Sequence, residues 1–491
     1  MEMNTIKTLG ALKKSGYTYQ SIKDEIRKNL IENLKNKRQV FKGIMGYEDT
    51  VIPDVERALL SKHNMNLLGL RGQAKTRIAS QMIGLLDEYI PIVAGSELND
   101  DPLKPISRYA LDLIEQMGDE TPIEWLHRDE RYVEKLATPD VTVADLIGDV
   151  DPIKAVNLKL NYSDERVIHF GLIPRANRSI FVINELPDLQ ARIQVSLFNI
   201  LQEGNIQIRG FKLRLPLDIQ FVFTANPEDY TNRGSIVTPL KDRIGSQILT
   251  HYPKDLDTAK AITKQEAKIS AFQKENIHCH PLINTLIEQV SFEARENEFV
   301  DAKSGVSARL GISALETVYS AAERRMLISG DRGTQIRIAD LYSIIPAITG
   351  KVEMVYEGEQ EGPFNVANIL IGKAIRSTFG LYFPVPEDNK RKGENKPVNQ
   401  YERIIKWFEK GNDADIVYTM SDKEYARTLN NIDGLATLVD SFQKDKGKMD
   451  TYLWMEFVLH GLAEYSKLGK SKLEKGTRFN DLLGSMFSFS E

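Results

Sequence analysis

The chain contains one cysteine, Cys279, in 491 residues, which excludes an internal disulfide framework and fits a reducing compartment. No apolar run reaches the ~18 residues that a membrane span needs, and the N-terminus lacks the long apolar stretch of a secretion signal. Charge of one sign is not in large excess, because the formal net charge is −5. That balance argues against a dedicated nucleic-acid binder. We therefore expect a cytoplasmic protein with no membrane span, and we do not expect nucleic acid as its partner.

The cysteine lies between His278 and His280, and this tripeptide raises the question of a metal site. Neighbouring side chains cannot all point at one ion, and no Cys-x-x-Cys or His-x-x-x-His partner lies nearby. The sequence therefore does not favour a metal there.

Apolar patterning divides the chain into four parts. Residues 1–40 are predicted to be a charged helical segment, and 41–253 alternate short apolar runs with helical segments, as a parallel α/β sheet does. Residues 254–350 are predicted to be all-helical, with helices such as 259–272 and 308–326. Residues 351–491 are expected to be a further helical region, with a polar linker near 386–399.

Within the α/β part, three apolar runs are expected as strands buried on both faces, because they lack strict alternation. They are Met65–Leu68, 179–183 and Ile219–Ala225. Apolar residues alternate with polar ones at 204–218, around Arg209 and Gly210, which predicts a β-hairpin.

The most informative segment runs from 67 to 80, LLGLRGQAKTRIAS. A short apolar strand enters a turn with Gly69 and Gly72, and Lys75 and Thr76 open a helix, which is the context of a phosphate-binding P-loop. Backbone N–H groups and the helix N-terminus favour phosphate there. The lysine is placed to reach the outer phosphates, and the threonine hydroxyl can ligate Mg²⁺. Ala74 replaces the second glycine of the usual pattern, so a plain glycine-containing turn is the alternative interpretation.

Two further strands end in polar residues. The run at 179–183 is followed by Asn184 and Glu185, which has the form of a Walker B element with an amide in place of the first acid. Glu185 remains as a general-base candidate, whereas a buried strand that simply ends at a turn is the alternative. The run at 219–225 delivers Asn226 at its carboxyl end, where ligands of α/β sheets collect. An Asn-Pro turn would account for the same residue.

In this order, these elements resemble the AAA+ ATPases, and most closely the branch that contains MoxR-like proteins and the ATPase subunit of magnesium chelatase. In that branch the loop Gly-x-x-Gly-x-Ala-Lys-Thr at 69–76 is a known variant, so Ala74 fits. Further matching segments are GIMGY at 43–47, GLIPRAN at 171–177, the hairpin at 204–218, TPLKDRIG at 238–245 and SGVSAR at 304–309. The resemblance covers roughly residues 40–345 and implies a P-loop core with a hairpin insertion in its second core helix, followed by a helical lid.

The resemblance also implies a role for each matching residue. It places the bound nucleotide against Gly69, Arg71, Gly72, Gln73, Ala74, Lys75, Thr76 and Arg77, with Ile44, Met45 and Gly46 on the adenine side and Arg309 as sensor 2. Magnesium would be held by Thr76 and Asn184. Glu185 would polarise water, Asn226 would be sensor 1, and Arg243 would act in trans as an arginine finger, with Arg233 as its competitor. A surface arginine and a helix-surface salt bridge are the plain alternatives for Arg243 and Arg309.

The expected function is that of an ATP-hydrolysing ring, with a hexamer the expected form, because a finger from a neighbouring subunit completes each site. Its expected action is remodelling or maturation of a partner protein. A separate protein with a von Willebrand factor A domain is implied as the partner, since this chain has no D-x-S-x-S motif. Two alternatives stay open: the motor subunit of a magnesium-chelatase-type complex, and a nucleotide-gated scaffold that hydrolyses little ATP, which Asn184 suggests.

Overall fold

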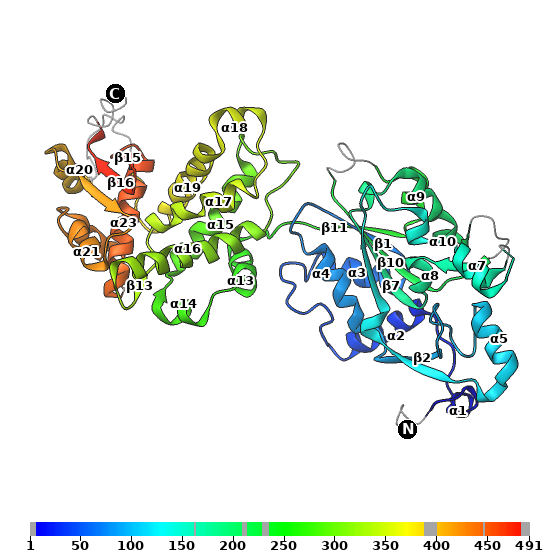
Figure 1. Cartoon of the computed structure of the whole chain (residues 1–491). Coiled ribbons are helices and arrows are strands. Elements are labelled where there is room, and N and C mark those ends of the chain that lie inside the picture. Colours follow the sequence, from blue (N-terminus) through cyan, green and yellow to red (C-terminus); the bar gives the residue numbers. More distant parts are fainter. Residues whose placement is uncertain are drawn as a thin grey trace. The chain divides into compact units, whose positions relative to one another are not determined.

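The computed structural model of the chain describes residues 6–161, 164–208, 214–227, 235–386, 400–444 and 447–482. These residues form two compact units, Met1–His251 and Tyr252–Glu491 (Figure 1). None of the described helices is both long and apolar enough to cross a bilayer.

The centre of the first unit is a five-stranded sheet in the order β11-β1-β10-β7-β4, and every neighbouring pair in it is parallel. Its strands are β1 (Met65–Leu68), β4 (Tyr132–Leu136), β7 (Ser179–Asn184), β10 (Ile219–Ala225) and β11 (Ser246–Leu249). The three strands expected from the sequence are confirmed as β1, β7 and β10. The edge strands β4 and β11 were not expected, because their burial is partial and their apolar runs are broken.

Helices cover both faces of this sheet (Figure 1). Ile180 and Val182 of β7 lie in a core with α2 (Ile22–Lys35), α3 (Val51–Leu60) and α4 (Lys75–Gln81). The alternate residues Phe181 and Ile183 lie in a second core. That core includes side chains of α8 (Leu172–Arg175), α9 (Ala191–Ser196), α10 (Phe198–Glu203) and α12 (Thr238–Arg243). Burial of both faces explains why β7 and β10 read as continuous apolar runs.

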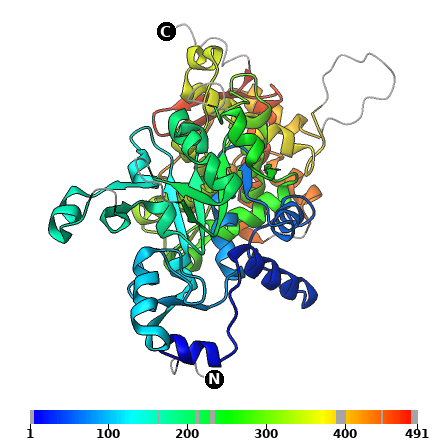
Figure 2. The ribbon, with the colours of Figure 1, turned by 90° about the vertical axis from the view of Figure 1, so that its right-hand side faces the viewer.

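The N-terminal segment packs at one end of this unit. Helix α1 (Leu9–Lys14) lies close to α5 (Arg108–Met117) in both views (Figures 1 and 2). The antiparallel pair β2 (Tyr89–Val93) and β3 (Ile123–His127) contacts this segment: Leu12 of α1 and Ile123 of β3 share a small core, and the Trp125 indole donates to the Ile6 carbonyl, ahead of the helix, at 3.0 Å. Helix α2 begins where the Ser21 hydroxyl accepts from the Asp24 N–H, and it buries Ile22, Ile26 and Leu30 at helical spacing, as the sequence predicts.

Two hairpins extend the first unit. The predicted hairpin is present as β8 (Asn205–Gln207) and β9 (Arg214–Pro216), which precede β10 directly; Arg209, Gly210 and Lys212 lie outside the described residues. A second, unpredicted pair joins β5 (Gly148–Val150) to β6 (Ile168–Phe170). With α6 (Val143–Leu146) and α7 (Pro152–Leu158) it precedes the β7 strand, and Figure 2 shows it projecting from the sheet.

The second unit has one apolar core that reaches from Ile277 to Phe479. Its elements are α13 (Leu256–Glu266), α14 (Ala271–Asn276), β12 (Ile277–His278), α15 (Pro281–Glu296), α16 (Arg309–Ser329), β13 (Thr334–Gln335), α17 (Ile345–Thr349), α18 (Tyr356–Glu361), α19 (Pro363–Phe379), α20 (Glu402–Glu409), β14 (Ala414–Val417), α21 (Asp422–Asn430), α22 (Leu435–Phe442), α23 (Lys448–Glu464), β15 (Gly469–Leu473) and β16 (Gly476–Asn480).

Three details of this unit differ from the sequence-based expectation. The span 254–350, predicted to be all-helical, also contains the two-residue strands β12 and β13, which pair in parallel. The helix expected at 259–272 is two helices, because Ser270 forms a capping box with Gln273 that starts α14 afresh. The region after 400 also contains an antiparallel sheet, β14-β16-β15, beside its helices. Most of the expected linker, 387–399, lies outside the described residues.

Candidate nucleotide-binding site

The P-loop connects the carboxyl end of β1 to the first turn of α4. The Gly69 N–H donates to the Ala225 carbonyl of β10 at 3.1 Å, so the loop starts against the neighbouring strand. A Cβ at Gly69 would lie 1.9 Å from the Thr250 hydroxyl, which shows why glycine is required there. Ala74 precedes the helix with φ 55°, a left-handed conformation that suits glycine better than alanine. The chain therefore follows the path of a P-loop. Ala74 is more strained in this conformation than the glycine of the usual sequence would be.

Gln73 and Tyr47 tie this loop to its surroundings. The Thr250 hydroxyl donates to Gln73 Oε1 at 2.6 Å, and the Tyr47 hydroxyl donates to the Gln73 carbonyl at 3.1 Å and to the His251 carbonyl at 2.7 Å. These bonds bring the segment around 43–47, expected on the adenine side, next to the loop. Sequence reasoning named Gln73 as a loop residue and included Tyr47 in the adenine-side segment, but it did not name Thr250.

Lys75 is buried at the start of α4, where its ammonium group lies among oxygen atoms. Nζ donates to the carbonyls of Gly69 and Leu70 and, at 2.8 Å, to Oδ1 of Asn226. A buried ammonium that donates to several oxygen atoms at the start of a helix is suited to the charge of a polyphosphate. The structure thus brings together Lys75 and Asn226, which are 151 positions apart in the chain.

Asn226 also contacts the general-base candidate. Its Nδ2 donates to Oε2 of Glu185 at 3.1 Å, so one amide bridges the lysine and the glutamate. Glu185 adopts φ 54° directly after β7, and its N–H donates to the Thr224 hydroxyl at 3.1 Å. A left-handed residue at a strand end turns the chain sharply and fixes the direction of its side chain.

Asn184 occupies the other side of the site. Its Oδ1 accepts from the hydroxyls of Thr224 at 3.1 Å and Thr76 at 3.4 Å, and its Nδ2 donates to Oε1 of Glu134 on β4. Thr76 and Asn184, the two expected magnesium ligands, are therefore in contact. Sequence reasoning missed Thr224 and Glu134. Thr224 lies two residues before Asn226, and the alternation of side chains along β4 places Glu134 on one face of the sheet.

The strand order explains this convergence. Strand β10 lies between β1 and β7, so it delivers Asn226 between Lys75 and Glu185. All three strands are parallel, and their carboxyl ends meet at one edge. The arrangement can bind a triphosphate at the loop and place a carboxylate beside its end.

The remaining predicted residues lie in four places. Ile44 is buried, while Met45, Gly46, Gly72 and Arg77 are partly buried and Arg71 is exposed near the loop. Arg243 ends α12, where Nε donates to Gln202 at 2.9 Å and the guanidinium lies 5.0 Å from the Phe198 ring centre. Arg309 begins α16 in the second unit. Arg233 lies outside the described residues.

The segment at 171–177 supports β7 from its opposite end. The Asn177 side chain is buried and donates to the Leu98 carbonyl at 2.9 Å, and its Oδ1 accepts from the Asp218 N–H at 2.9 Å. Arg178 pairs with Asp101 at 3.0 Å. This motif holds the amino end of the strand and does not reach the nucleotide site.

The three side chains of the His-Cys-His tripeptide make separate contacts. His278 lies 3.2 Å from Asp450, and Nδ1 of His280 accepts from the Leu282 N–H at the start of α15. Burial raises the pKa of the Cys279 thiol to about 12. Nowhere among the described residues do three His, Cys, Asp or Glu side chains gather as in a metal site.

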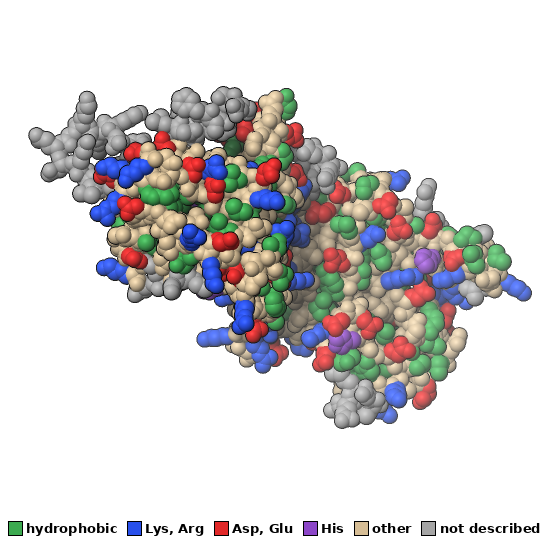
Figure 3. Space-filling model, turned by 60° about the vertical axis from the view of Figure 1, so that its left-hand side comes forward, with side chains coloured by type: hydrophobic (Ala, Val, Ile, Leu, Met, Phe, Trp, Pro, Cys, Tyr) green, Lys and Arg blue, Asp and Glu red, His purple; other side chains and the backbone are tan. Residues whose placement is uncertain are grey.

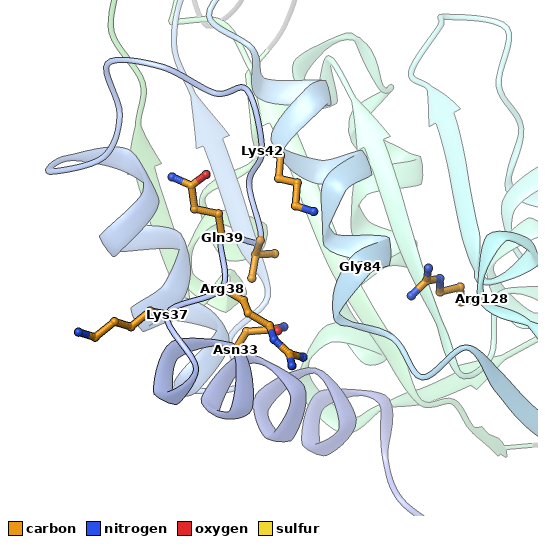
Figure 4. A pocket seen from close by; sticks show the side chains of 8 residues that line it. Asn33, Lys37, Arg38, Gln39, Lys42, Gly84 and Arg128 are labelled. Atoms are coloured by element: carbon orange, nitrogen blue, oxygen red, sulfur yellow. The ribbon is translucent and has the colours of Figure 1, made fainter.

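A basic hollow of ≈ 820 Å³ lies away from the P-loop (Figure 4). It includes Gly84, which follows the far end of α4 from Lys75. Its other lining residues are Asn33, Lys37, Arg38, Gln39, Val40, Lys42 and Arg128. Figure 4 shows Lys37 pointing away from the others.

The P-loop strand and the Walker B-like strand lie on either side of one strand with a polar end, as expected for the AAA+ fold, and this chain has that fold. No protein-family model matches the chain. Over 153 residues it is 28% identical to the 38 kDa subunit of magnesium chelatase from Cereibacter sphaeroides, covering 29% of this chain and 43% of that protein. The counterpart from Rhodobacter capsulatus is 26% identical over 141 residues, with 25% and 39% covered. The chain is thus an AAA+ protein related to this subunit, which confirms the branch expected from its motifs.

These matches span less than half the length of either relative. Among solved structures, one chain of a complex between magnesium chelatase subunits BchI and BchD is 19% identical, with a TM-score of 0.32, and 62% of this chain and 95% of that chain are covered. The strand order and the P-loop identify the fold of this chain.

Proposed function

We propose that the chain binds ATP with Mg²⁺ at this site and hydrolyses it, as a ring-forming motor of the MoxR-like kind that remodels or matures a partner protein. One observation carries the proposal: Asn226 bonds to both Lys75 and Glu185, so a phosphate-binding cation and a general-base candidate share one positioning group. That arrangement has a clear use in phosphoryl transfer, where catalysis is mostly positioning and charge stabilisation.

The side chains present fit magnesium. Thr76 and Asn184 offer a hydroxyl and an amide oxygen, and Mg²⁺ prefers such hard oxygen ligands while keeping several waters. When bound, the ion would neutralise charge on the phosphates. The amide at Asn184 brings no negative charge of its own, so we expect hydrolysis to be slow.

In the proposed hydrolysis each residue has one role. Lys75 binds the outer phosphates, Glu185 accepts a proton from the attacking water, and Asn226 fixes the position of both side chains. Thr224 holds the Glu185 main chain and Asn184 Oδ1 in place. The other loop residues and the adenine-side residues are proposed to bind the nucleotide, with Arg309 as sensor 2, as the resemblance implies.

The ring is proposed because Arg243 is expected to reach a neighbouring subunit's nucleotide. A guanidinium is permanently charged and suits spreading phosphoryl charge. Head-to-tail contacts that close give a ring, with a hexamer the expected form. A separate protein with a von Willebrand factor A domain remains the expected partner.

ATP turnover by the purified full chain tests the hydrolysis. A Glu185→Gln variant removes the base, and we expect its rate to fall by roughly 10²–10⁴-fold while it still binds ATP. Glu203→Gln, an exposed change on α10, is the matched control. Equal rates for wild type and Glu185→Gln would show that the activity comes from another site. Sedimentation with and without nucleotide tests the ring.

Two alternatives have one observation each. The match to the 38 kDa chelatase subunit favours a chelatase motor, and Mg²⁺ insertion into a porphyrin, assayed with candidate partner subunits, would select it. Asn184 favours a nucleotide-gated scaffold, which tight ATP binding without phosphate release would select. Acidic and basic side chains are interspersed on the face in Figure 3, in keeping with a protein partner over nucleic acid.

A further inference from the structure

Asn184 is held with its amide in one direction. Its Nδ2 donates to the Glu134 carboxylate, and its Oδ1 therefore faces the hydroxyls of Thr76 and Thr224. The side chain is only 8% exposed, so these contacts define its orientation. Oδ1 of Asn184 points toward Thr76 because the Glu134 carboxylate accepts a hydrogen bond from Nδ2, the other end of the amide.

Glu134 reaches Asn184 because of the sheet register. Leu136 of β4 lies opposite Asn184, and Glu134 lies opposite Val182. Val182 faces α4, and the alternation of a strand puts Asn184 on that same face. Glu134 and Asn184 are thus diagonal neighbours across two strands, within reach of long side chains.

The second oxygen of this carboxylate is also fixed. The Tyr132 hydroxyl, two residues earlier on the same face of β4, donates to Oε2 of Glu134 at 3.1 Å. Tyr132 in turn packs against the core under α4. Glu134 is exposed, and each of its two carboxylate oxygens has a hydrogen-bond partner.

We propose that Glu134 supplies the carboxylate of the magnesium site, and that it replaces in charge the acid that Asn184 lacks. This inference rests on the proposed nucleotide site. Magnesium keeps several of its waters and is commonly bound through one or two carboxylates with the phosphates. A carboxylate bonded to a ligand is also the usual means of orienting that ligand and strengthening its hold on a metal. The negative charge of Glu134 lies one hydrogen bond away from Asn184, the residue that accepts from the Thr76 hydroxyl.

The substitution Glu134→Gln separates charge from hydrogen bonding. A glutamine oxygen can still accept from Asn184 Nδ2, so the amide keeps its orientation while the negative charge is lost. Exchanging both residues, as Glu134→Gln with Asn184→Asp, returns one carboxylate to the pair. Glu130→Gln removes an exposed charge nearby and serves as the matched control.

The experiment titrates Mg²⁺ into each full-chain variant with a non-hydrolysable ATP analogue and follows nucleotide affinity, with EDTA as the metal-free reference. We expect Glu134→Gln to bind nucleotide like wild type in EDTA but to need about tenfold more Mg²⁺ for the same gain in affinity. The exchanged pair should restore the wild-type requirement, and Glu130→Gln should not change it.

An unchanged Mg²⁺ requirement in Glu134→Gln would overturn the inference, as would failure of the exchanged pair to restore it. Neither result would affect the proposed nucleotide site, because binding in EDTA reports on that separately. A folded wild-type chain that binds no nucleotide in either buffer would instead overturn the proposed function, and this inference with it.

Discussion

The buried polar side chains of the two units form two patterns. In the first unit Gln73, Lys75, Asn184 and Asn226 gather at the carboxyl edge of one sheet. In both units buried charged groups pair across elements that are distant in sequence, and the second unit is joined in this way. The first pattern places polar groups where a ligand can meet them, and the second joins parts of a fold. Burial of polar groups alone therefore does not identify a site.

The second unit's pairs are built around two arginines. Arg325 of α16 contacts Asp340 at 2.9 Å and donates to Thr334 of β13 at 2.7 Å. Arg337 contacts Asp422, at the start of α21, at 2.6 Å. These bonds connect residues before and after position 400 within one core. Each charge has a partner inside the unit, which suits a structural role.

The largest expected effect comes from breaking this network. Arg325→Met should lower the free energy of unfolding by about 3–5 kcal/mol, because it leaves the Asp340 carboxylate buried without its cation. Denaturant unfolding measures this, and Arg324→Met, an exposed neighbour on the same helix, is the control. Equal stability of the two variants would contradict the structural role.

A smaller effect is expected at the P-loop. Gly69→Ala puts a Cβ 1.9 Å from the Thr250 hydroxyl and 2.2 Å from Gln73 Oε1, so the loop must shift. Overpacking of this kind costs about 1–3 kcal/mol, and nucleotide affinity should fall with it. Gly84→Ala meets nothing within 4 Å and is the matched control. Thermal unfolding and ATP binding of both variants decide the point, and normal binding by Gly69→Ala would count against the loop geometry.

The next prediction concerns the one thiol. Because burial raises the pKa of Cys279 to about 12, the thiol stays protonated in the folded chain at pH 9. The unfolded chain releases this proton near its usual pKa of about 8.5, so the stability contributed by the neutral thiol is lost as pH rises above that value. Only the thiolate reacts with iodoacetamide, so alkylation of the native chain should be far slower than that of the unfolded chain, while its rate still rises about tenfold per pH unit from 7 to 9. A native rate as fast as the unfolded one, or one that levels off near pH 9, would contradict the burial.

The smallest effect is expected at Ala74. Its left-handed backbone costs an alanine about 1–2 kcal/mol, part of which the greater freedom of an unfolded glycine offsets. Ala74→Gly should therefore leave stability unchanged or raise it by up to about 1 kcal/mol, with nucleotide binding retained. Ala79→Gly, in the interior of α4, should instead destabilise. Loss of stability in Ala74→Gly, measured by thermal unfolding, would show that this position needs its methyl group.

The elements that the sequence predicted well are those buried on both faces. β1, β7 and β10 are continuous apolar runs, so both their position and the polar residues at their ends could be read directly. β4 was missed because it is an edge strand with alternating exposure, and Glu134 was missed with it. Bonds such as that of Tyr47 to Gln73 depend on loops meeting in space, which no local pattern encodes. The capping box at Ser270 could have been recognised in the sequence, but the apolar residues that continue at helical spacing across it favoured one long helix.

The proposed site places one nucleotide among Lys75, Asn226 and Glu185. Calorimetric titration of the full chain with ATP and Mg²⁺ tests it most directly. We expect saturation at one nucleotide per chain, and a loss of about 10–100-fold in affinity in Lys75→Met, because a charged hydrogen-bond donor to phosphate is removed. Lys35→Met, an exposed change on α2, should bind like wild type. No saturable heat from the folded wild type, or equal affinity in Lys75→Met, would contradict the claim.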